Sequence, residues 1–99
     1  MIDHDTATAT ELRDAIFSDM QSRAPGVRLP PRVRWLVTRA AARHARSRDT
    51  FCRAAGLPPA SAEALELLRE ACDIAEGMGP DLLEATRLWH AHIGLPGAA

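Results

Sequence analysis

The chain has 99 residues, of which 46% are hydrophobic and 25% are charged, and its formal net charge is −1. This composition is typical of one small folded domain and excludes a largely disordered chain. No apolar run approaches the roughly 20 residues that span a bilayer, and the acidic start Met1-Ile2-Asp3-His4-Asp5 is unlike a signal peptide, so we expect a cytoplasmic protein with no membrane contact.

Abundant alanine, the absence of Tyr and Lys, and only four aromatic residues favour an all-α fold. The first predicted helix covers residues 9–22. It begins with Thr8-Ala9-Thr10-Glu11, which has the form of a capping box. Residues 1–8 are predicted to be a loose N-terminal tail.

The second helix is predicted to begin at Pro31, because proline is favoured in the first turn of a helix, and to reach Arg46 or Ser47. Asp49 is then expected to cap a new, short helix over residues 50–55.

Gly56 is predicted to be a left-handed helix end, followed by the longest helix over residues 59–76, which closes at Gly77. A final helix is expected over residues 80–93, with residues 95–99 frayed. The predicted fold is therefore a compact bundle of four helices plus one short helix, in a single domain over residues 9–94.

Residues 48–67 fit the outline of a helix-turn-helix, with Gly56 in the turn. The helix that would enter the DNA groove is acidic, however, and like charge disfavours contact with phosphates. We therefore interpret the outline as a coincidence of packing.

Basic and acidic residues are concentrated in different segments of the chain. Eight of the twelve arginines fall in residues 20–48, which contain no acid. At about 100° per residue, four of these arginines share one face of the second helix, with Trp35 beside them. The predicted partner-binding residues on this arginine face are Arg32, Trp35, Arg39, Arg43 and Arg46. The opposite stripe, Val33, Val37, Ala40, Ala41 and His44, is expected to face the core.

The longest helix carries an acidic stripe and a wide apolar arc. The acids are Glu63, Glu66, Glu70 and Asp73. The arc is interpreted as a dimer seam, formed by Leu65, Leu67, Leu68, Ala71 and Ile74. The sequence leaves open whether the acidic and basic stripes are solvated, pair with each other, or bind another molecule.

No pattern of catalytic residues is recognisable, so we expect no enzymatic activity, no cofactor and no metal. His90 and His92 are two residues apart, which places them on different sides of a helix. Cys52 and Cys72 are expected to be buried thiols in the core.

The sequence thus predicts a small module for protein–protein interaction or regulation, acting as a homodimer or on a larger protein with an acidic surface. One alternative is a nucleic-acid-binding regulator that contacts phosphates through the same arginine face. A second is an accessory subunit of a larger enzyme.

Overall fold

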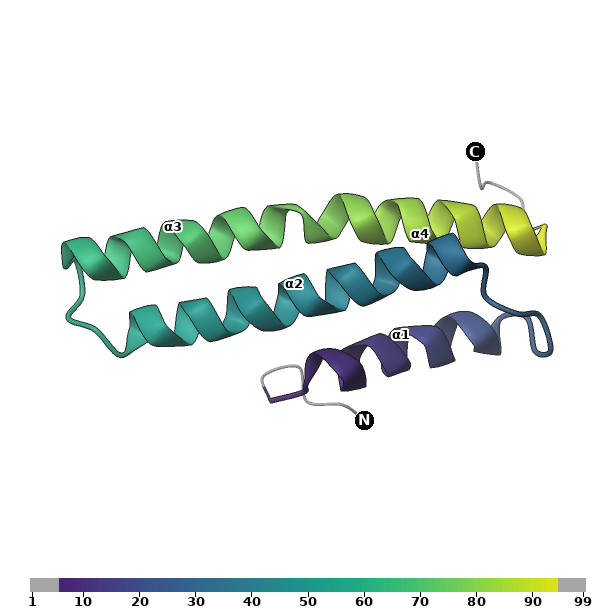
Figure 1. Ribbon diagram of the computed structural model, residues 1–99, viewed down its shortest axis with the longest axis horizontal. Helices are drawn as coiled ribbons and strands as arrows, with labels where there is room; N and C mark the ends of the chain where they lie inside the picture. Colours follow the sequence, from purple (N-terminus) through teal and green to yellow (C-terminus); the bar gives the residue numbers. More distant parts are fainter. Residues whose placement is uncertain (1–5, 95–99) are drawn as a thin grey trace.

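The computed structural model describes residues 6–94, and within this range the chain forms four helices and no strand (Figure 1). The helices are α1 (Ala9–Ser22), α2 (Pro31–Ala55), α3 (Ala62–Glu76) and α4 (Met78–Ile93). The prediction of an all-α fold is confirmed. Among the described residues, no helix has the length and apolar character needed to cross a membrane.

The start of α1 is fixed by the predicted capping box. The Thr8 hydroxyl accepts a hydrogen bond from the Glu11 backbone N–H at 3.1 Å, and the Glu11 carboxylate accepts one from the Thr8 N–H at 3.3 Å. Ala7 is buried, and its carbonyl accepts a 2.6 Å hydrogen bond from Arg48. Residues 7 and 8 therefore belong to the folded domain, contrary to the predicted tail; residues 1–5 of that tail lie outside the described residues.

Helix α2 is longer than predicted, because it continues without a break through Ser47 and Asp49 to Ala55. The Ser47 hydroxyl donates to the carbonyl of Ala71 on α3, and Thr50 and Ala54 are buried. These contacts outweigh the weak local preference of Ser and Asp for a helix end. The separate short helix over residues 50–55 was a wrong prediction.

The turn after α2 also differs from prediction. Gly56 has a right-handed conformation, with φ of −82°, whereas Ala60 takes the left-handed one, with φ of 65°. Pro58 and Pro59 lie in this turn, and Ser61 caps α3 by accepting a hydrogen bond from the Ala64 N–H at 3.2 Å. A serine hydroxyl can accept a hydrogen bond from a free backbone N–H in the first turn of a helix, whereas proline has no side-chain acceptor. Helix α3 therefore begins at Ala62, after Ser61, and not at residue 59.

Helix α3 ends at Gly77 as predicted, but α4 begins directly afterwards at Met78 and not at residue 80. In Figure 1 the two helices follow one another in nearly the same direction. Within the described residues, the chain therefore has four helices and no additional short one. Because α3 and α4 run nearly end to end, the structure consists of three rods: α1, α2, and α3 together with α4.

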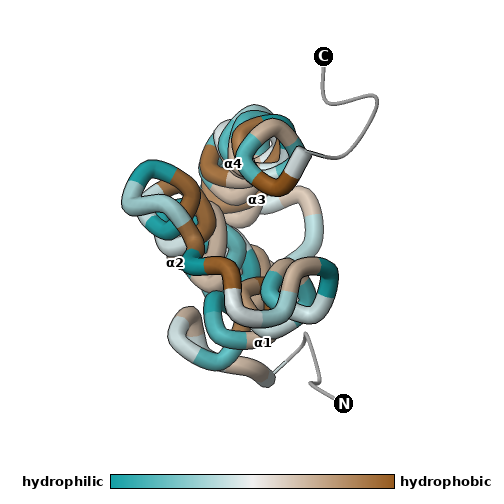
Figure 2. Tube along the Cα trace, turned by 90° about the vertical axis from the view of Figure 1, so that its right-hand side faces the viewer, coloured by the Kyte–Doolittle hydropathy of each residue, from teal (hydrophilic) through white to brown (hydrophobic). Residues whose placement is uncertain are grey.

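Helix α2 lies in the middle of the molecule. Both α1 and the α3–α4 rod pack against it in the opposite direction, while the backbones of α1 and α4 stay farther from each other (Figures 1 and 2). The molecule is elongated, with extents of 50 × 27 × 19 Å and a radius of gyration of 16.0 Å. A compact chain of this length would have a radius of gyration of about 13 Å, so the predicted compact bundle is not what the chain forms.

The main core lies where α1, α2 and α4 meet. Trp89 is 1% exposed, and its indole N–H donates to the carbonyl of Met20 at 3.1 Å. Val33 and Val37 are fully buried against it, as predicted for the core face of α2. A smaller cluster of Ala7, Leu12 and Ala41 continues the core along α1.

Residues 47–76, which we call the arm, extend α2 and α3 beyond the reach of α1 (Figure 1). Here α2 and α3 form an antiparallel hairpin, whereas a helix-turn-helix crosses its helices at about 90–120°. The buried residues of the arm are small: Thr50, Ala54, Ala64 and Ala71. The arm thus holds together through close contact of small side chains and contributes little to the main core.

Candidate functional site

The predicted arginine face lies on α2 with Trp35 near its centre. Trp35 is 48% exposed, and the guanidinium carbons of Arg32 and Arg39 lie 4.7 and 5.1 Å from the centre of its ring system. Both distances are in the range of a cation–π interaction. The exposed position of Trp35 and its contact with Arg39 agree with the sequence analysis.

Asp81, which the sequence analysis did not single out, lies beneath this face. Its Oδ2 atom is 3.1 Å from Nε of Arg39 and 3.7 Å from Nε of Arg43, and the residue is 9% exposed. The geometry gives Oδ2 no hydrogen bond, so the contact is an ion pair without good alignment. No local signal links position 81 to α2, since the pairing depends on how α4 packs.

The four arginines therefore have different surroundings. Arg39 and Arg43 are within ion-pair distance of Asp81, although Arg39 is also exposed, whereas Arg32 and Arg46 are exposed and have no ion pair in the described chain. Arg43 also lies directly against Gly77, at the junction of α3 and α4. Asp81 thus already neutralises part of the charge of Arg39 and Arg43, whereas Arg32 and Arg46 are available to an acidic group of another molecule.

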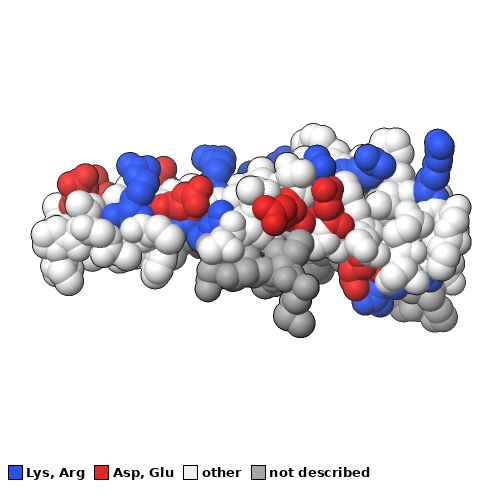
Figure 3. Space-filling view, turned by 90° about the horizontal axis from the view of Figure 1, so that it is seen from below, with Lys and Arg blue, Asp and Glu red and all other residues white. Residues whose placement is uncertain are grey.

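The acidic stripe lies on α3, whereas the arginine face lies on α2. Glu63, Glu66, Glu70 and Asp73 are all exposed. Among residues 6–94, no ion pair joins these acids to the arginine face; the α2 arginines pair instead with Asp81 on α4 and with Asp49 on α2 itself. Figure 3 shows basic and acidic groups side by side on one face of the molecule, with basic groups along one edge. The two stripes do not neutralise each other within the chain.

The predicted seam residues on α3 divide into two groups. Ala71 is buried against α2, where its carbonyl accepts the Ser47 hydrogen bond. Leu65 is 53% exposed, and Leu67, Leu68 and Ile74 are partly exposed. Phe51 of α2 is 56% exposed. The arm therefore presents apolar side chains from both of its helices.

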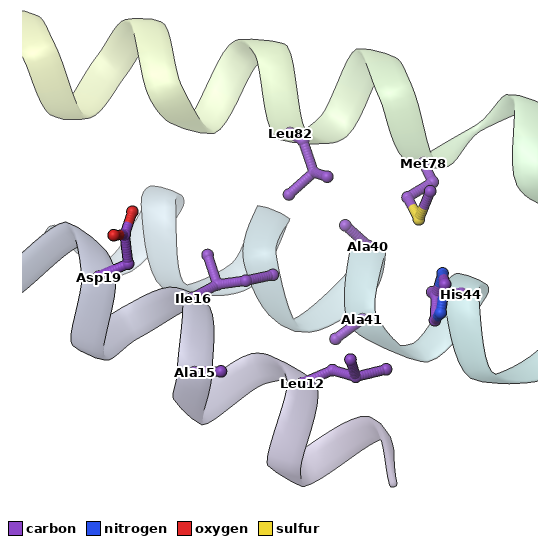
Figure 4. A pocket seen from close by; sticks show the side chains of 9 residues that line it. All are labelled: Leu12, Ala15, Ile16, Asp19, Ala40, Ala41, His44, Met78 and Leu82. Atoms are coloured by element: carbon purple, nitrogen blue, oxygen red, sulfur yellow. The ribbon is translucent and has the colours of Figure 1, made fainter. Parts of the chain in front are cut away.

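A separate apolar groove lies between α1 and α4, with α2 as its floor (Figure 4). Its volume is about 440 Å³. Ala40 and Ala41 lie on the floor, and the side chains along the walls come from α1 and α4. Asp19 and His44 lie at its two ends in Figure 4. Sequence periodicity missed this groove because it shows which residues share a helix face, not which helices leave a gap.

The histidines and cysteines do not form a metal site in the described part of the chain, where no group of three or more metal-binding side chains gathers. His92 stacks on Trp89 with 5.8 Å between ring centres, and His44 is partly buried. Cys52 and Cys72 are free and exposed, so the prediction that they are core thiols was wrong. Small alanines occupy the α2–α3 contact in their place.

Comparison of the chain with protein-family models, with curated proteins and with solved structures gives no match.

Proposed function

We propose that the protein is an association module that forms a homodimer through its arm. The observation that carries this proposal is the exposure of large apolar side chains on an arm whose own buried residues are almost all alanines. Phe51 and Leu65 are each more than half exposed, from two different helices. Exposed apolar residues that form one patch are typical of a surface that another protein covers, and the proposal requires Phe51 and Leu65 to share such a patch.

The length of the molecule supports the same proposal. Helix α1 covers only one half of α2, so the arm has two helices where the rest of the domain has three (Figure 1). Two helices alone bury little apolar surface, and a second arm packed on the first would create a four-helix arrangement with its own core. A symmetric contact of this kind is the commonest way in which identical chains associate.

The charged stripes would guide the partner chain. The acidic stripe of α3 is exposed and has no ion pair within the described chain, and Arg46 at the arm end of the arginine face is exposed as well. If two arms pack in opposite directions, the acids of one copy can approach the basic residues of the other. Exposed ion pairs contribute about 0.2–1 kcal/mol each, so their effect is on register and orientation more than on affinity.

A pair of matched leucine substitutions tests the proposal. Leu65→Glu places a charge on the arm, and Leu83→Glu places the same charge on α4, where Leu83 is 73% exposed and remote from the seam. Neither change disturbs a buried residue. Sedimentation of the unchanged protein and of Leu83→Glu is expected to give about twice the 10.7 kDa chain mass, and Leu65→Glu that of one chain.

Two outcomes would reject the dimer. One is a single-chain mass for the unchanged protein at high concentration. The other is dissociation by Leu83→Glu with Leu65→Glu still paired, which would place the contact on α4.

A further inference from the structure

The groove between α1 and α4 lies outside the proposed dimer surface, and its chemistry differs from that of the arm. Its exposed lining is almost wholly apolar, and its volume of about 440 Å³ falls within the usual 300–1,000 Å³ of small-molecule sites. We propose that this groove binds a small molecule with an unbranched alkyl chain.

The side chains in the groove suit such a chain. Ala40 and Ala41 of α2 are 1% and 2% exposed and form a floor without large side chains. The walls are aliphatic and come from α1 and α4, with the side chains directed into the space between the helices (Figure 4). These wall residues are Leu12, Ala15, Ile16, Met78 and Leu82. Small residues below and flexible aliphatic residues at the sides leave a narrow trough.

The groove continues into a second, neighbouring cavity. A second hollow of about 320 Å³ shares Ile16, Asp19 and Leu82 with the first and continues along the same two helices to Arg23 and His90. A space drawn out between two helices in this way fits an extended chain better than a round ligand.

The apolar part is too short for a docked helix. A helix that binds in a groove inserts side chains at i, i+4 and i+7, which lie over about 10 Å. The larger apolar wall residues on α1, Leu12 and Ile16, span four positions, and so do Met78 and Leu82 on α4. Four positions correspond to about 6 Å, so a helix could place only one or two anchors in the first hollow, whereas a thin alkyl chain can continue past Ile16 and Leu82 into the second.

Two different polar side chains border the first hollow. His44 lies at one end of the first hollow (Figure 4). The carboxylate of Asp19, which is 3.7 Å from Nη2 of Arg23, lies where the first hollow joins the second. A ligand with an acidic head group would place its head near His44, and a ligand with a basic head group would place it near Asp19. The alkyl chain is common to both, and the choice of probe distinguishes the two.

Titration calorimetry with decanoate, octanoate and decylamine tests this site. Because each buried methylene strengthens binding about fourfold, octanoate should bind roughly 15-fold more weakly than decanoate. Tighter binding of decanoate than of decylamine would place the head group at His44, and the reverse would place it at Asp19. Absence of saturable binding by both ten-carbon probes would overturn the proposal.

Two substitutions on α1 locate the binding. Ala15→Leu fills the groove from a position that is not fully buried and should weaken binding of the tighter ten-carbon probe at least tenfold. Ser18→Leu adds the same side chain on the exposed side of α1 and should leave binding unchanged. Equal effects of the two substitutions would contradict the site.

Methyl NMR gives a second readout that does not depend on a variant. The probe should shift the signals of Ile16 and Leu82 and leave that of Leu65 on the arm unmoved; shifts confined to the arm would overturn the assignment. The same titration on the Leu65→Glu protein separates the two proposals, because the groove should bind the alkyl chain whether or not the arm forms a dimer. A disulfide-linked dimer of an Ala15→Cys variant in which Cys52 and Cys72 are replaced by serine, together with no probe binding, would show instead that a second copy fills the groove.

Discussion

The guanidinium of Arg43 occupies the space in which any residue other than glycine at position 77 would place its Cβ. Gly77 is the single residue between α3 and α4, and its φ of −73° is one that any residue adopts. The glycine is therefore needed for the close approach of Arg43 and not for its backbone conformation.

This relationship predicts a coupling between the two positions. Gly77→Ala alone should change the free energy of unfolding by less than about 1 kcal/mol, because the gain from replacing glycine is offset by displacement of Arg43 from Asp81. In an Arg43→Ala background the same change should stabilise by about 0.4–1 kcal/mol, as there is no longer a side chain to displace. Urea denaturation of the four proteins measures the coupling, and additive effects would contradict it.

Asp81 should contribute to stability although no sequence pattern marks it. Its carboxylate lies within ion-pair distance of two arginines on α2 and in the first turn of α4, where negative charge is favoured. Asp81→Ala should lower the free energy of unfolding by about 1–2 kcal/mol. Glu70→Ala, which removes an exposed acid without a recorded partner on α3, is the control and should change it by less than about 0.5 kcal/mol. Equal effects would show that Asp81 has no special role.

The two tryptophans should respond differently to substitution. Trp89 is buried and donates a hydrogen bond to Met20, so Trp89→Phe should leave a cavity, remove this hydrogen bond and destabilise the fold by about 2–4 kcal/mol. Trp35→Phe, at an exposed position, should cost less than about 1 kcal/mol. Thermal denaturation measures both. In the Trp89→Phe protein, the remaining fluorescence should be that of an exposed indole and easily quenched.

Glu84 provides a test of the electrostatics of α4. The hydrogen bond from Arg87, with Nε at 3.0 Å and Nη2 at 2.6 Å, is the largest cause of a lowered pKa at Glu84, and the charges of Arg87 and Arg32 act in the same direction. Arg87→Gln should therefore raise the pKa of Glu84 toward its ordinary value, as followed by NMR titration of the carboxyl carbon. Because the folded-state pKa is lowered, any stability from this pair is present at neutral pH and is lost as the pH falls through that value. A pKa that does not move would show that the pair is absent in solution.

Binding to nucleic acid is the rival to association through protein contacts. If Arg32, Arg39, Arg43 and Arg46 neutralised four phosphates, affinity for duplex DNA or RNA would fall with salt with a log–log slope of about −3.6. Because Asp81 already pairs with two of these arginines, we expect no measurable duplex binding at about 50 mM salt. Binding with the steep slope would favour the rival function.

The sequence by itself predicted the features that depend on neighbouring residues. The capping box at Thr8 and Glu11 and the limits of α1 follow from local hydrogen bonds and appear as expected. Helical periodicity likewise separated the buried Val33 and Val37 from the exposed Trp35. Such features need no knowledge of other helices, because the face of a helix is set by its 3.6-residue repeat.

Only the tertiary structure decided how the helices pack against one another and which side chains this packing leaves exposed. The continuation of α2 past Ser47 depends on a hydrogen bond to Ala71, which is 24 positions away, and the surroundings of Arg39 depend on Asp81. The exposure of Phe51 and the open groove follow from α1 covering only one half of α2. The sequence of a helix shows how wide its apolar face is. Contacts with helices far away in the chain decide which part of that face is buried.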